Sequence, residues 1–472
     1  MPQVLYVILM IAYLITVIGI IVVVVSENRN PLKSLAWVTV LLFLPLVGIV
    51  LYIFFGRNLK SRQLISRRNK RKLLNKEDFK QIDINSLPLS DESKQEIKLA
   101  KSLTGAIYFP GNQIDIFTDG ESKFKALLND IDNATTFINL QYYIFENDKI
   151  GCTIAEHLIA KAKAGVHVRV IYDHVGCFGV KNKFYKRMLD AGIEIGPFLK
   201  VTFPQFASRL NWRNHRKVVI IDGHIGYIGG MNIADRYVSG NRLGPWRDTH
   251  LRICGPAVGG IEYSFAIDWN FMGRQLITDR TRKFDITPQQ PAGVQIVTSG
   301  PMGTWGNISF IFLKAISNAK KFVYLQTPYF LPTESLLKAL QAAALAKVDV
   351  RIMIPRKSDS KTLTYASFSY IKECLKAGIK FYLYDGGMLH AKTIIIDEEF
   401  CTTGSSNFDF RSFEHNFEVN AFIYSKEVNR KMLEQFNKDQ EQCTRVIGNS
   451  WRHRPLLQRI AESTTRLMSP IL

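Results

Sequence analysis

The sequence predicts an α/β protein in which two similar halves, each a mixed sheet flanked by helices, face each other about a pseudo-two-fold axis and follow a two-helix transmembrane hairpin. Three observations predict this fold: two apolar runs at the start, a repeated series of strand-like and helix-like segments, and one polar motif in each repeat. We expect a hairpin over 1–56, a basic neck and linker over 57–109, a first half over 110–290, and a second half with a C-terminal tail over 291–472.

The first 55 residues contain two apolar runs, each long enough to cross a membrane. Residues 4–25 and 35–55 lack charged side chains, and as helices both would cover the ~30 Å hydrocarbon core. A cleaved signal peptide is the alternative for the first run. That alternative is weakened because the run lacks a basic start and no small-residue cleavage site precedes Asn28. We therefore expect two spanning helices.

The segment after the second run indicates how the chain is oriented. Residues 57–72 contain eight basic side chains and no acidic one, whereas the connector 26–34 carries Glu27, Arg29 and Lys33. By the positive-inside rule, we expect residues 57–72, the amino terminus and the globular body on the cytoplasmic side of a bacterial cell membrane. The same basic cluster attracts anionic lipid headgroups.

The composition indicates an anionic partner and a reducing compartment. The 472 residues include 61 Lys and Arg against 41 Asp and Glu, a formal charge of +20, so nucleic acid and acidic lipid both fit as partners. The six cysteines are scattered without a C-x-x-C pair. We interpret them as reduced thiols, the alternative being one structural disulfide, and we expect no metal site.

The globular part repeats its sequence pattern. Residues 133–143 read NATTFINLQYY and residues 318–329 read NAKKFVYLQTPY, each an apolar, β-rich stretch that follows a helix-like segment. A helical segment and a strand come next in both copies, VHVRVIYD in the first and VDVRIMIP in the second. A second helix then ends before Gly192 or Gly378, which we expect as helix C-caps.

Each copy ends with a strand that carries the same polar motif. Residues 215–232 read HRKVVIIDGHIGYIGGMN and residues 390–407 read HAKTIIIDEEFCTTGSSN, so both match H-x-K-x4-D-x6-G-[GS]-x-N. A single histidine at a strand start is usually structural, but two matches at equivalent places in a repeat argue against chance. The motif is therefore predicted to be functional.

The motif spacing suits a phosphate. Residues two apart on a strand project to the same face, so His215 and Lys217 would aim at one point, and the second copy repeats this. Small residues let the backbone approach a ligand, and asparagine amides donate hydrogen bonds to phosphate oxygens. The residues expected to bind substrate in this way are Gly229, Gly230, Asn232, Gly404, Ser405 and Asn407.

The doubled motif resembles the HKD motif of the phospholipase D superfamily, and the resemblance covers about residues 110–445. It implies two phospholipase D-like halves that share one active site, where one histidine attacks phosphorus and the other protonates the leaving oxygen. It also implies that no metal or other cofactor is needed. The catalytic residues implied by the resemblance are His215, Lys217, Asp222, His390, Lys392 and Asp397.

The resemblance also assigns a role to each of these residues. His215 or His390 would be the nucleophile, with His215 favoured, while the two motif lysines and asparagines would stabilise the charged transition state. Asp222 and Asp397 would support the local structure. The family's downstream Asn-x-Glu pattern matches residues 416–418, so Glu418 is expected to orient His390. By analogy, Asp248 is expected to orient His215.

The two ends of the chain indicate the substrate. Residues 30–57 and 454–470 resemble the corresponding segments of bacterial cardiolipin synthases. The resemblance implies a membrane enzyme that joins two phosphatidylglycerol molecules into cardiolipin and glycerol without ATP or CTP. Its partners would be anionic phospholipids and the bilayer, with no nucleic acid and no obligate protein partner. The alternatives are a lipid phosphodiesterase that uses water, a membrane-tethered nuclease, and an inactive scaffold.

Overall fold

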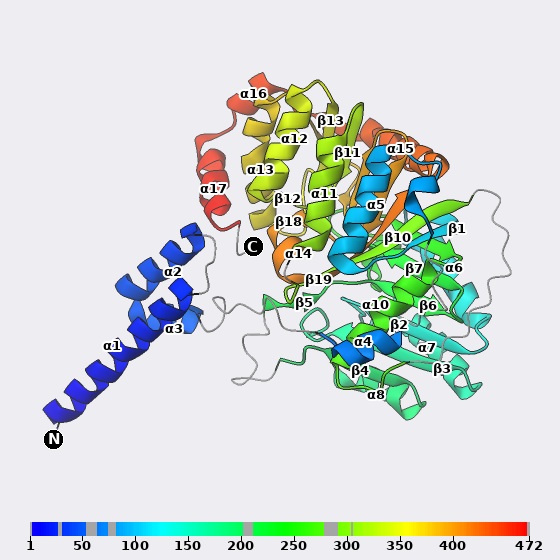
Figure 1. Cartoon of the computed structure of the whole chain (residues 1–472), viewed down its shortest axis with the longest axis horizontal. Coiled ribbons are helices and arrows are strands. Elements are labelled where there is room, and N and C mark those ends of the chain that lie inside the picture. Colours follow the sequence, from blue (N-terminus) through cyan, green and yellow to red (C-terminus); the bar gives the residue numbers. More distant parts are fainter. Residues whose placement is uncertain are drawn as a thin grey trace. The chain divides into compact units, whose positions relative to one another are not determined.

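The computed structural model describes residues 2–26, 31–52, 64–73, 82–201, 211–277, 291–303 and 305–469 (Figure 1). The chain divides into two compact units. One contains residues 1–60 and 200–211, and the other contains residues 61–199 and 212–472. The apolar segments therefore belong to the first unit, and both motifs belong to the second.

The first apolar run forms a single long helix. Helix α1 (Pro2–Ser26) has 25 residues, which corresponds to roughly 37 Å at 1.5 Å per residue. Over Gln3–Ser26 it is long and apolar enough to cross a membrane, and it is the one such helix within the described ranges. The predicted first span matches this helix.

The second apolar run is broken into two helices. Helices α2 (Pro31–Phe43) and α3 (Pro45–Leu51) are separated at Leu44, whose backbone lies at φ −133 and ψ 61. The break has a simple cause: proline lacks an N–H, and its ring disfavours a helical conformation in the residue before it. The rings of Trp37 and Tyr52 lie 5.3 Å apart, whereas a straight helix would separate them by about 22 Å. Helix α3 thus folds back along α2, and the predicted second straight span is absent from residues 31–52.

The second unit opens with short helices that precede the repeat. They are α4 (Arg67–Leu73), the 3-10 turn η3 (Ile84–Ser86) and α5 (Asp91–Thr104). Helix α5 begins at an N-cap serine, Ser90, and ends at Gly105, whose φ of 77 suits glycine. Of the predicted basic neck and linker, residues 57–63 and 74–81 lie outside the described residues.

Among the described residues between Tyr108 and Phe271, the first half supplies nine strands and five helices. In chain order they are β1 (Tyr108–Phe117), α6 (Gly120–Asp132), β2 (Phe137–Tyr142), α7 (Lys149–Lys163), β3 (His167–Asp173), α8 (Asn182–Asp190), β4 (Glu194–Phe198), β5 (Arg213–Asn214), β6 (Val218–Ile221), β7 (Ile225–Gly229), α9 (Arg236–Ser239), β8 (Trp246–Arg247), β9 (His250–Cys254) and α10 (Val258–Phe271).

The second half repeats this order from Ala292 onward. Its elements are β10 (Ala292–Ser299), α11 (Asn307–Asn318), β11 (Phe322–Gln326), β12 (Phe330–Leu331), α12 (Glu334–Leu345), β13 (Asp349–Pro355), α13 (Lys361–Lys376), β14 (Lys380–Tyr384), β15 (Met388–Leu389), β16 (Thr393–Ile396), β17 (Phe400–Gly404), β18 (Phe408–Asp409), α14 (Phe410–Glu414), β19 (Asn416–Tyr424) and α15 (Lys426–Glu441). A tail of β20 (Cys443–Arg445), α16 (Gly448–Arg452) and α17 (Leu456–Leu467) follows.

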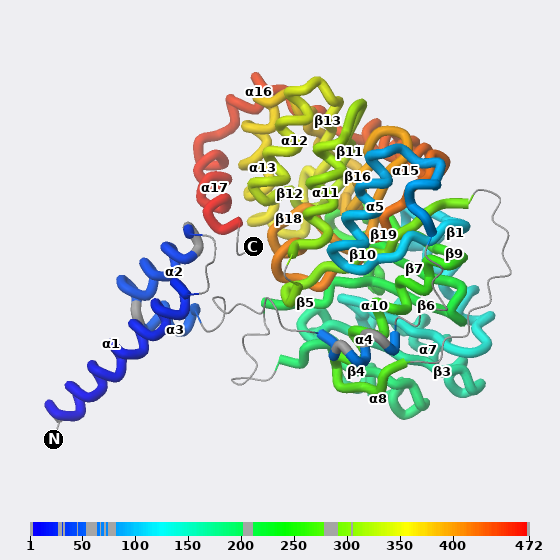
Figure 2. Tube along the Cα trace, in the orientation of Figure 1, coloured from blue at the N-terminus to red at the C-terminus, as the bar shows by residue number. Residues whose placement is uncertain are grey.

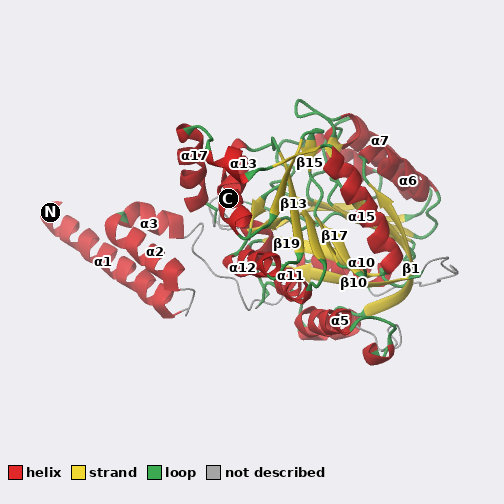
Figure 3. Ribbon diagram, turned by 90° about the horizontal axis from the view of Figure 1, so that it is seen from above, coloured by secondary structure: helices red, strands yellow, loops and turns green. Residues whose placement is uncertain are grey.

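The two halves share one mixed sheet. Its strand order is β20-β14-β13-β11-β16-β17-β19-β10-β1-β9-β7-β6-β2-β3-β4, and the halves join where β1 pairs antiparallel with β10. The order reads the same outward from that junction in both directions, apart from β20. Figure 2 shows the first half in cyan and green beside the second half, which runs from yellow-green to red. In Figure 3, helices cover both faces of the strands. The predicted α/β class and repeated element order match this arrangement.

Local details of the prediction also match. The apolar runs that follow the motif lysines form β6 and β16, which are buried along their whole length. Gly192 and Gly378 follow the ends of α8 and α13 with φ values of 89 and 94, the left-handed region that glycine adopts readily. Each motif lysine therefore lies immediately before a buried strand, β6 or β16.

Candidate active site

A cleft of about 330 Å³ contains both motif histidines. Six polar residues of its lining matter for chemistry: Arg213, His215 and Asn232 from the first half, and His390, Asn407 and Arg411 from the second. A larger cavity of about 450 Å³ lies beside α5 and contains neither histidine. The structure thus brings the two motifs together in one cleft, as the sequence predicts.

Each motif histidine is held by a strand of the opposite half. Strand β5, just before His215, pairs with β19 of the second half, and the His215 N–H donates to the carbonyl oxygen of Phe417 at 2.9 Å. Strand β15, just before His390, pairs with β8 of the first half, and the His390 N–H donates to the carbonyl oxygen of Arg247 at 2.7 Å. The chain therefore crosses between the halves twice at the site.

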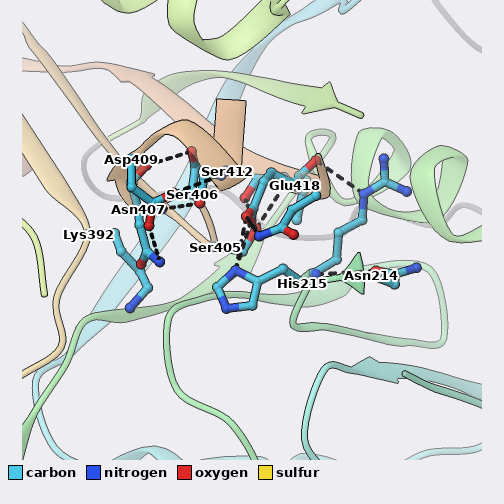
Figure 4. Close-up of polar contacts among 12 residues, drawn as sticks. Asn214, His215, Lys392, Ser405, Ser406, Asn407, Asp409, Ser412 and Glu418 are labelled. Carbon is cyan, nitrogen blue, oxygen red and sulfur yellow. Dashed lines mark hydrogen bonds and ion pairs between the residues drawn. The ribbon is translucent and has the colours of Figure 1, made fainter. Parts of the chain in front are cut away.

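Because of this crossing, each histidine contacts the carboxylate that was predicted for the other histidine. His215 Nδ1 lies 3.0 Å from Glu418 Oε1 (Figure 4), and His390 Nδ1 lies 2.6 Å from Asp248 Oδ2. The predicted pairs, Glu418 with His390 and Asp248 with His215, are wrong. The physical reason is that each histidine sits against a strand of the other half, so its nearest carboxylate comes from that half.

Buried hydrogen bonds fix both carboxylates. The hydroxyl of Ser405 and the amide of Asn416 donate to Glu418, and the Thr249 N–H donates to Asp248 at 2.7 Å. Burial alone would raise both carboxyl pKa values, but the neighbouring histidine and lysine charges lower the pKa of Glu418 and of Asp248 below their usual values. Both carboxylates are therefore ionised and hold Nδ1 of each imidazole, which leaves Nε2 for chemistry.

Burial lowers the pKa of both imidazoles. Burial, followed by the charge of Lys392, lowers the pKa of His390 to about 4. Burial also lowers the pKa of His215, although Glu418 opposes the change. A neutral imidazole can attack phosphorus. Both rings are backed at Nδ1 by a carboxylate, so the choice of His215 as nucleophile stays a prediction.

The motif lysines are buried beside the histidines. Lys217 Nζ donates to the His215 carbonyl oxygen at 2.6 Å, and Lys392 Nζ lies 3.3 Å from His390 Nε2. Burial lowers the pKa of both lysines, and the charge of Lys392 contributes to the lowering at Lys217. Two buried lysines, one from each half and each beside a motif histidine, suit a site that binds an anion.

The motif asparagines line the cleft, but the small motif residues do not. A Cβ on Gly230 would lie 2.1 Å from Asp248 Oδ1, and one on Gly404 would lie 2.3 Å from the Val419 carbonyl oxygen. Gly229 is crowded in the same way by His250. Gly229, Gly230, Gly404 and Ser405 were predicted to contact the ligand, but none of them is on the cleft lining. The three glycines make room for neighbouring chain, and Ser405 donates a hydrogen bond to Glu418.

The motif aspartates lie away from the cleft. Asp222 follows β6 and accepts hydrogen bonds from the backbone N–H groups of Thr135, Thr136 and Phe137 at 2.7–2.9 Å. Asp397 follows β16 and binds the N–H groups of residues 320–322 in the same way. Both aspartates have φ 49 and tie the motif strand to the neighbouring strand of its own half. Asp222 and Asp397 were grouped with the catalytic residues, but the structure places them where they support the local fold.

Three arginines at the cleft were missed by the sequence reasoning. Arg236 and Arg411 each follow the motif asparagine by four residues, so comparison of the repeats would have found both. Arg213 precedes His215 by two residues and has Met388 as its counterpart, so it breaks the repeat. The cleft consequently carries more positive charge than the motifs alone supply.

Comparison with known proteins identifies the family. A model described as "Cardiolipin synthase, PLD-like domain" matches residues 127–242 and 312–440, and one described as "Phospholipase_D-nuclease N-terminal" matches residues 10–57. The chain is 41% identical to the major cardiolipin synthase ClsA of Bacillus subtilis, over 98% of each chain. The chain belongs to the cardiolipin synthase family of phospholipase D-like proteins.

Other relatives agree with this assignment. The cardiolipin synthase of Oceanobacillus iheyensis is 40% identical over 94% of this chain and 95% of its own length. Among solved structures, phosphatidylserine synthase from Haemophilus influenzae matches with a TM-score of 0.60 and 12% identity, covering 80% of this chain and 100% of that one. That likeness supports the fold alone.

Proposed function

We propose that this protein is a cardiolipin synthase, a phosphatidyltransferase that moves a phosphatidyl group from one phosphatidylglycerol to another and releases glycerol. The observation that carries the proposal is the cleft that contains two imidazoles, each backed by a buried carboxylate. A buried lysine contacts each histidine from outside the cleft lining. Relatives that are about 40% identical over nearly their whole length carry this name.

In the first step, Nε2 of one motif histidine attacks the phosphorus of the donor lipid. A nitrogen–phosphorus bond forms, the bond from phosphorus to the glycerol oxygen breaks, and the other histidine gives that oxygen a proton. This step needs a neutral attacking ring and a protonated partner ring, and the negative charge of the lipid phosphate beside the partner ring favours its protonated form. The product is a phosphatidyl-histidine.

In the second step, the terminal hydroxyl of a second phosphatidylglycerol attacks the phosphatidyl-histidine. The now neutral partner histidine accepts the hydroxyl proton, an oxygen–phosphorus bond forms, and the nitrogen–phosphorus bond breaks. Lys217, Lys392, Asn232 and Asn407 stabilise the negative charge on the phosphorus oxygens in both steps. One phosphodiester replaces another, so the reaction proceeds without a nucleotide or another cofactor.

We also propose that the enzyme works at the cytoplasmic face of a bacterial membrane. Helix α1 anchors the chain in the bilayer, and the basic residues after the apolar segments remain on the cytoplasmic side. The second apolar run completes the two-segment anchor as the bent pair α2–α3 rather than as a straight span. The halves 110–290 and 291–472 are related by a pseudo-two-fold axis at the β1–β10 junction, which the strand order supports.

Product analysis tests the proposed function. The full-length protein, added to vesicles of pure phosphatidylglycerol, is expected to yield cardiolipin and glycerol in equal amounts, measured by mass spectrometry. Phosphatidic acid as the sole lipid product would show that water is the acceptor and would refute the synthase. Cleavage of added DNA without any lipid product would favour a nuclease.

A further inference from the structure

Large apolar side chains gather on the surface of the C-terminal tail. Among the described residues of the second compact unit, twelve such side chains are exposed, and six of them lie within 447–468. The four on α17 are Leu456, Leu457, Ile460 and Leu467, of which Leu457 and Leu467 are 82% and 84% exposed. On a helix, Leu456, Ile460 and Leu467 fall within about 40° of one another. These four residues form the α17 apolar face, and a cluster of this kind marks an interaction surface.

The opposite face of α17 is polar and is turned toward the protein. Glu462 is 3% exposed and accepts hydrogen bonds from Arg454 Nε at 3.0 Å and from Gln458 Nε2 at 2.9 Å. Arg466 Nη2 lies 2.5 Å from Glu373 Oε1 of helix α13. A surface helix normally buries its apolar face against the protein. Because α17 does the reverse, its packing against α13 does not account for the α17 apolar face.

Helix α13 connects α17 to the cleft. Leu363, in the first turn of α13, is part of the cleft lining. Tyr370 lies two turns later, about 10 Å along the helix axis, and its ring is 4.3 Å from the Arg466 guanidinium. Figures 1 and 3 show α17 beside α13. A membrane contact made through α17 would therefore keep the cleft close to the lipid surface.

The charges around the α17 apolar face match an anionic bilayer. Residues 444–472 include five arginines and one acidic residue, Glu462, which is paired with Arg454. Arg452 and Arg459 are exposed, one on each side of Leu456 in the sequence. Helices that lie in a membrane interface combine an apolar face with basic residues, which anionic headgroups attract. The tail has this combination.

A lipid surface fits the α17 apolar face better than a second protein does. A standard protein interface takes roughly 800 Å² and about 20 residues from each partner, whereas α17 has 12 residues and exposes one apolar stripe. A single amphipathic helix is enough for binding at a membrane interface. The size of the face therefore favours lipid.

We infer that α17 lies in the membrane interface, where its apolar face enters the acyl-chain region of anionic lipids and holds the second compact unit against the bilayer. This contact is separate from the anchor helix α1, which belongs to the first unit. It adds a docking surface to the unit that contains the cleft.

Fluorescence of a label on α17 tests this inference in the full-length protein. Leu457→Cys carries an environment-sensitive nitrobenzoxadiazole label, and serine replaces the two cysteines that are not buried, Cys152 and Cys443. The protein is reconstituted into vesicles of phosphatidylcholine and phosphatidylserine, with or without lipids that bear a nitroxide on the acyl chain. We expect the nitroxide lipids to lower the fluorescence at least about twofold, because an interfacial helix buries its apolar face roughly 5–10 Å into the acyl boundary.

Leu189→Cys is the matched control, because Leu189 is an exposed leucine near the end of α8 in the first half. Its label should stay in water and be insensitive to the nitroxide lipids. The same behaviour at residue 457 would overturn the inference. A label at 457 that is shielded from water but not quenched would also overturn it, since α1–α3 or a second copy would then cover the face. This assay needs no turnover, so its outcome is independent of the proposed function.

The rate of cardiolipin formation tests whether the contact holds the cleft at the membrane, and this measurement rests on the proposed function. On phosphatidylglycerol vesicles, Leu457→Glu is expected to be roughly 10-fold slower than wild type, because a carboxylate replaces a leucine that enters the lipid. In mixed micelles of phosphatidylglycerol and detergent the two rates should agree, and Leu189→Glu should match wild type in both. Equal vesicle rates for Leu457→Glu and wild type would refute the holding role, whereas an inactive wild-type enzyme would refute the proposed function instead.

Discussion

Replacement of either motif histidine by asparagine is expected to lower the rate of cardiolipin formation by about 10⁴-fold or more. Asparagine keeps a polar group of similar size, but it cannot attack phosphorus or carry a proton at neutral pH. His215 and His390 lie in the same cleft and are each backed by a carboxylate, so loss of either one should stop the whole cycle. The rate of cardiolipin formation from purified phosphatidylglycerol measures the effect.

The matched control for the histidine variants is His224→Asn. His224 lies just after the first motif aspartate and contacts the Asp222 carbonyl oxygen at 3.1 Å, outside the cleft lining. This variant should retain activity within about threefold, since surface substitutions away from special features change little. Retention of full activity by His215→Asn or by His390→Asn would remove the catalytic assignment.

Replacement of Glu418 by glutamine, or of Asp248 by asparagine, is expected to lower activity by roughly 10²- to 10⁴-fold. Each carboxylate holds Nδ1 of a histidine at 2.6–3.0 Å, and a neutral amide can hold the ring in the wrong tautomer. Loss of the negative charge also leaves the developing imidazolium unbalanced in a buried site. Initial rates and melting temperatures, measured on the same preparations, separate catalysis from folding.

Double variants test which carboxylate belongs to which histidine. Residues that act as one unit are not additive, so Glu418→Gln should add little to the loss caused by His215→Asn. Asp248→Asn should likewise add little to His390→Asn. Glu373→Gln, which alters an acidic residue that contacts Arg466 on the tail, serves as the control. Glu418→Gln or Asp248→Asn enzymes with wild-type rates would show that the carboxylates do not orient the rings.

The repeated part of the fold was predictable because, in each half, the local sequence pattern favours the same helices and strands that the structure contains. Apolar runs after Lys217 and Lys392 predict buried strands, and both form them. Gly192 and Gly378 predict helix ends, and both have a positive φ. The duplication turned an ordinary histidine into a strong candidate, since chance rarely repeats a motif at the same place. Each of these signals comes from residues that are close together in the sequence or repeated in it. One sequence is therefore enough to recognise them.

The features that could not be predicted depend on contacts across the molecule. The family's Asn-x-Glu pattern led to the pairing of Glu418 with His390, which belong to one half, but β5 and β15 each cross to the opposite half. The role of Gly230 was missed for the same reason, since Asp248 approaches it from a strand distant in sequence. The break at Leu44 was foreseeable from Pro45, yet the length of the apolar run outweighed that signal.

Trapping the covalent intermediate tests most directly whether both halves serve a single phosphorus atom. The enzyme is mixed briefly with phosphatidylglycerol and quenched at alkaline pH, where the bond between histidine and phosphorus is stable. Its peptides are then analysed by mass spectrometry. We predict at most one phosphatidyl group per chain, on the peptide containing either His215 or His390 and never on both, with no label in the variant lacking that nucleophile. Label on both peptides, approaching two groups per chain, would show two independent sites and contradict the shared cleft.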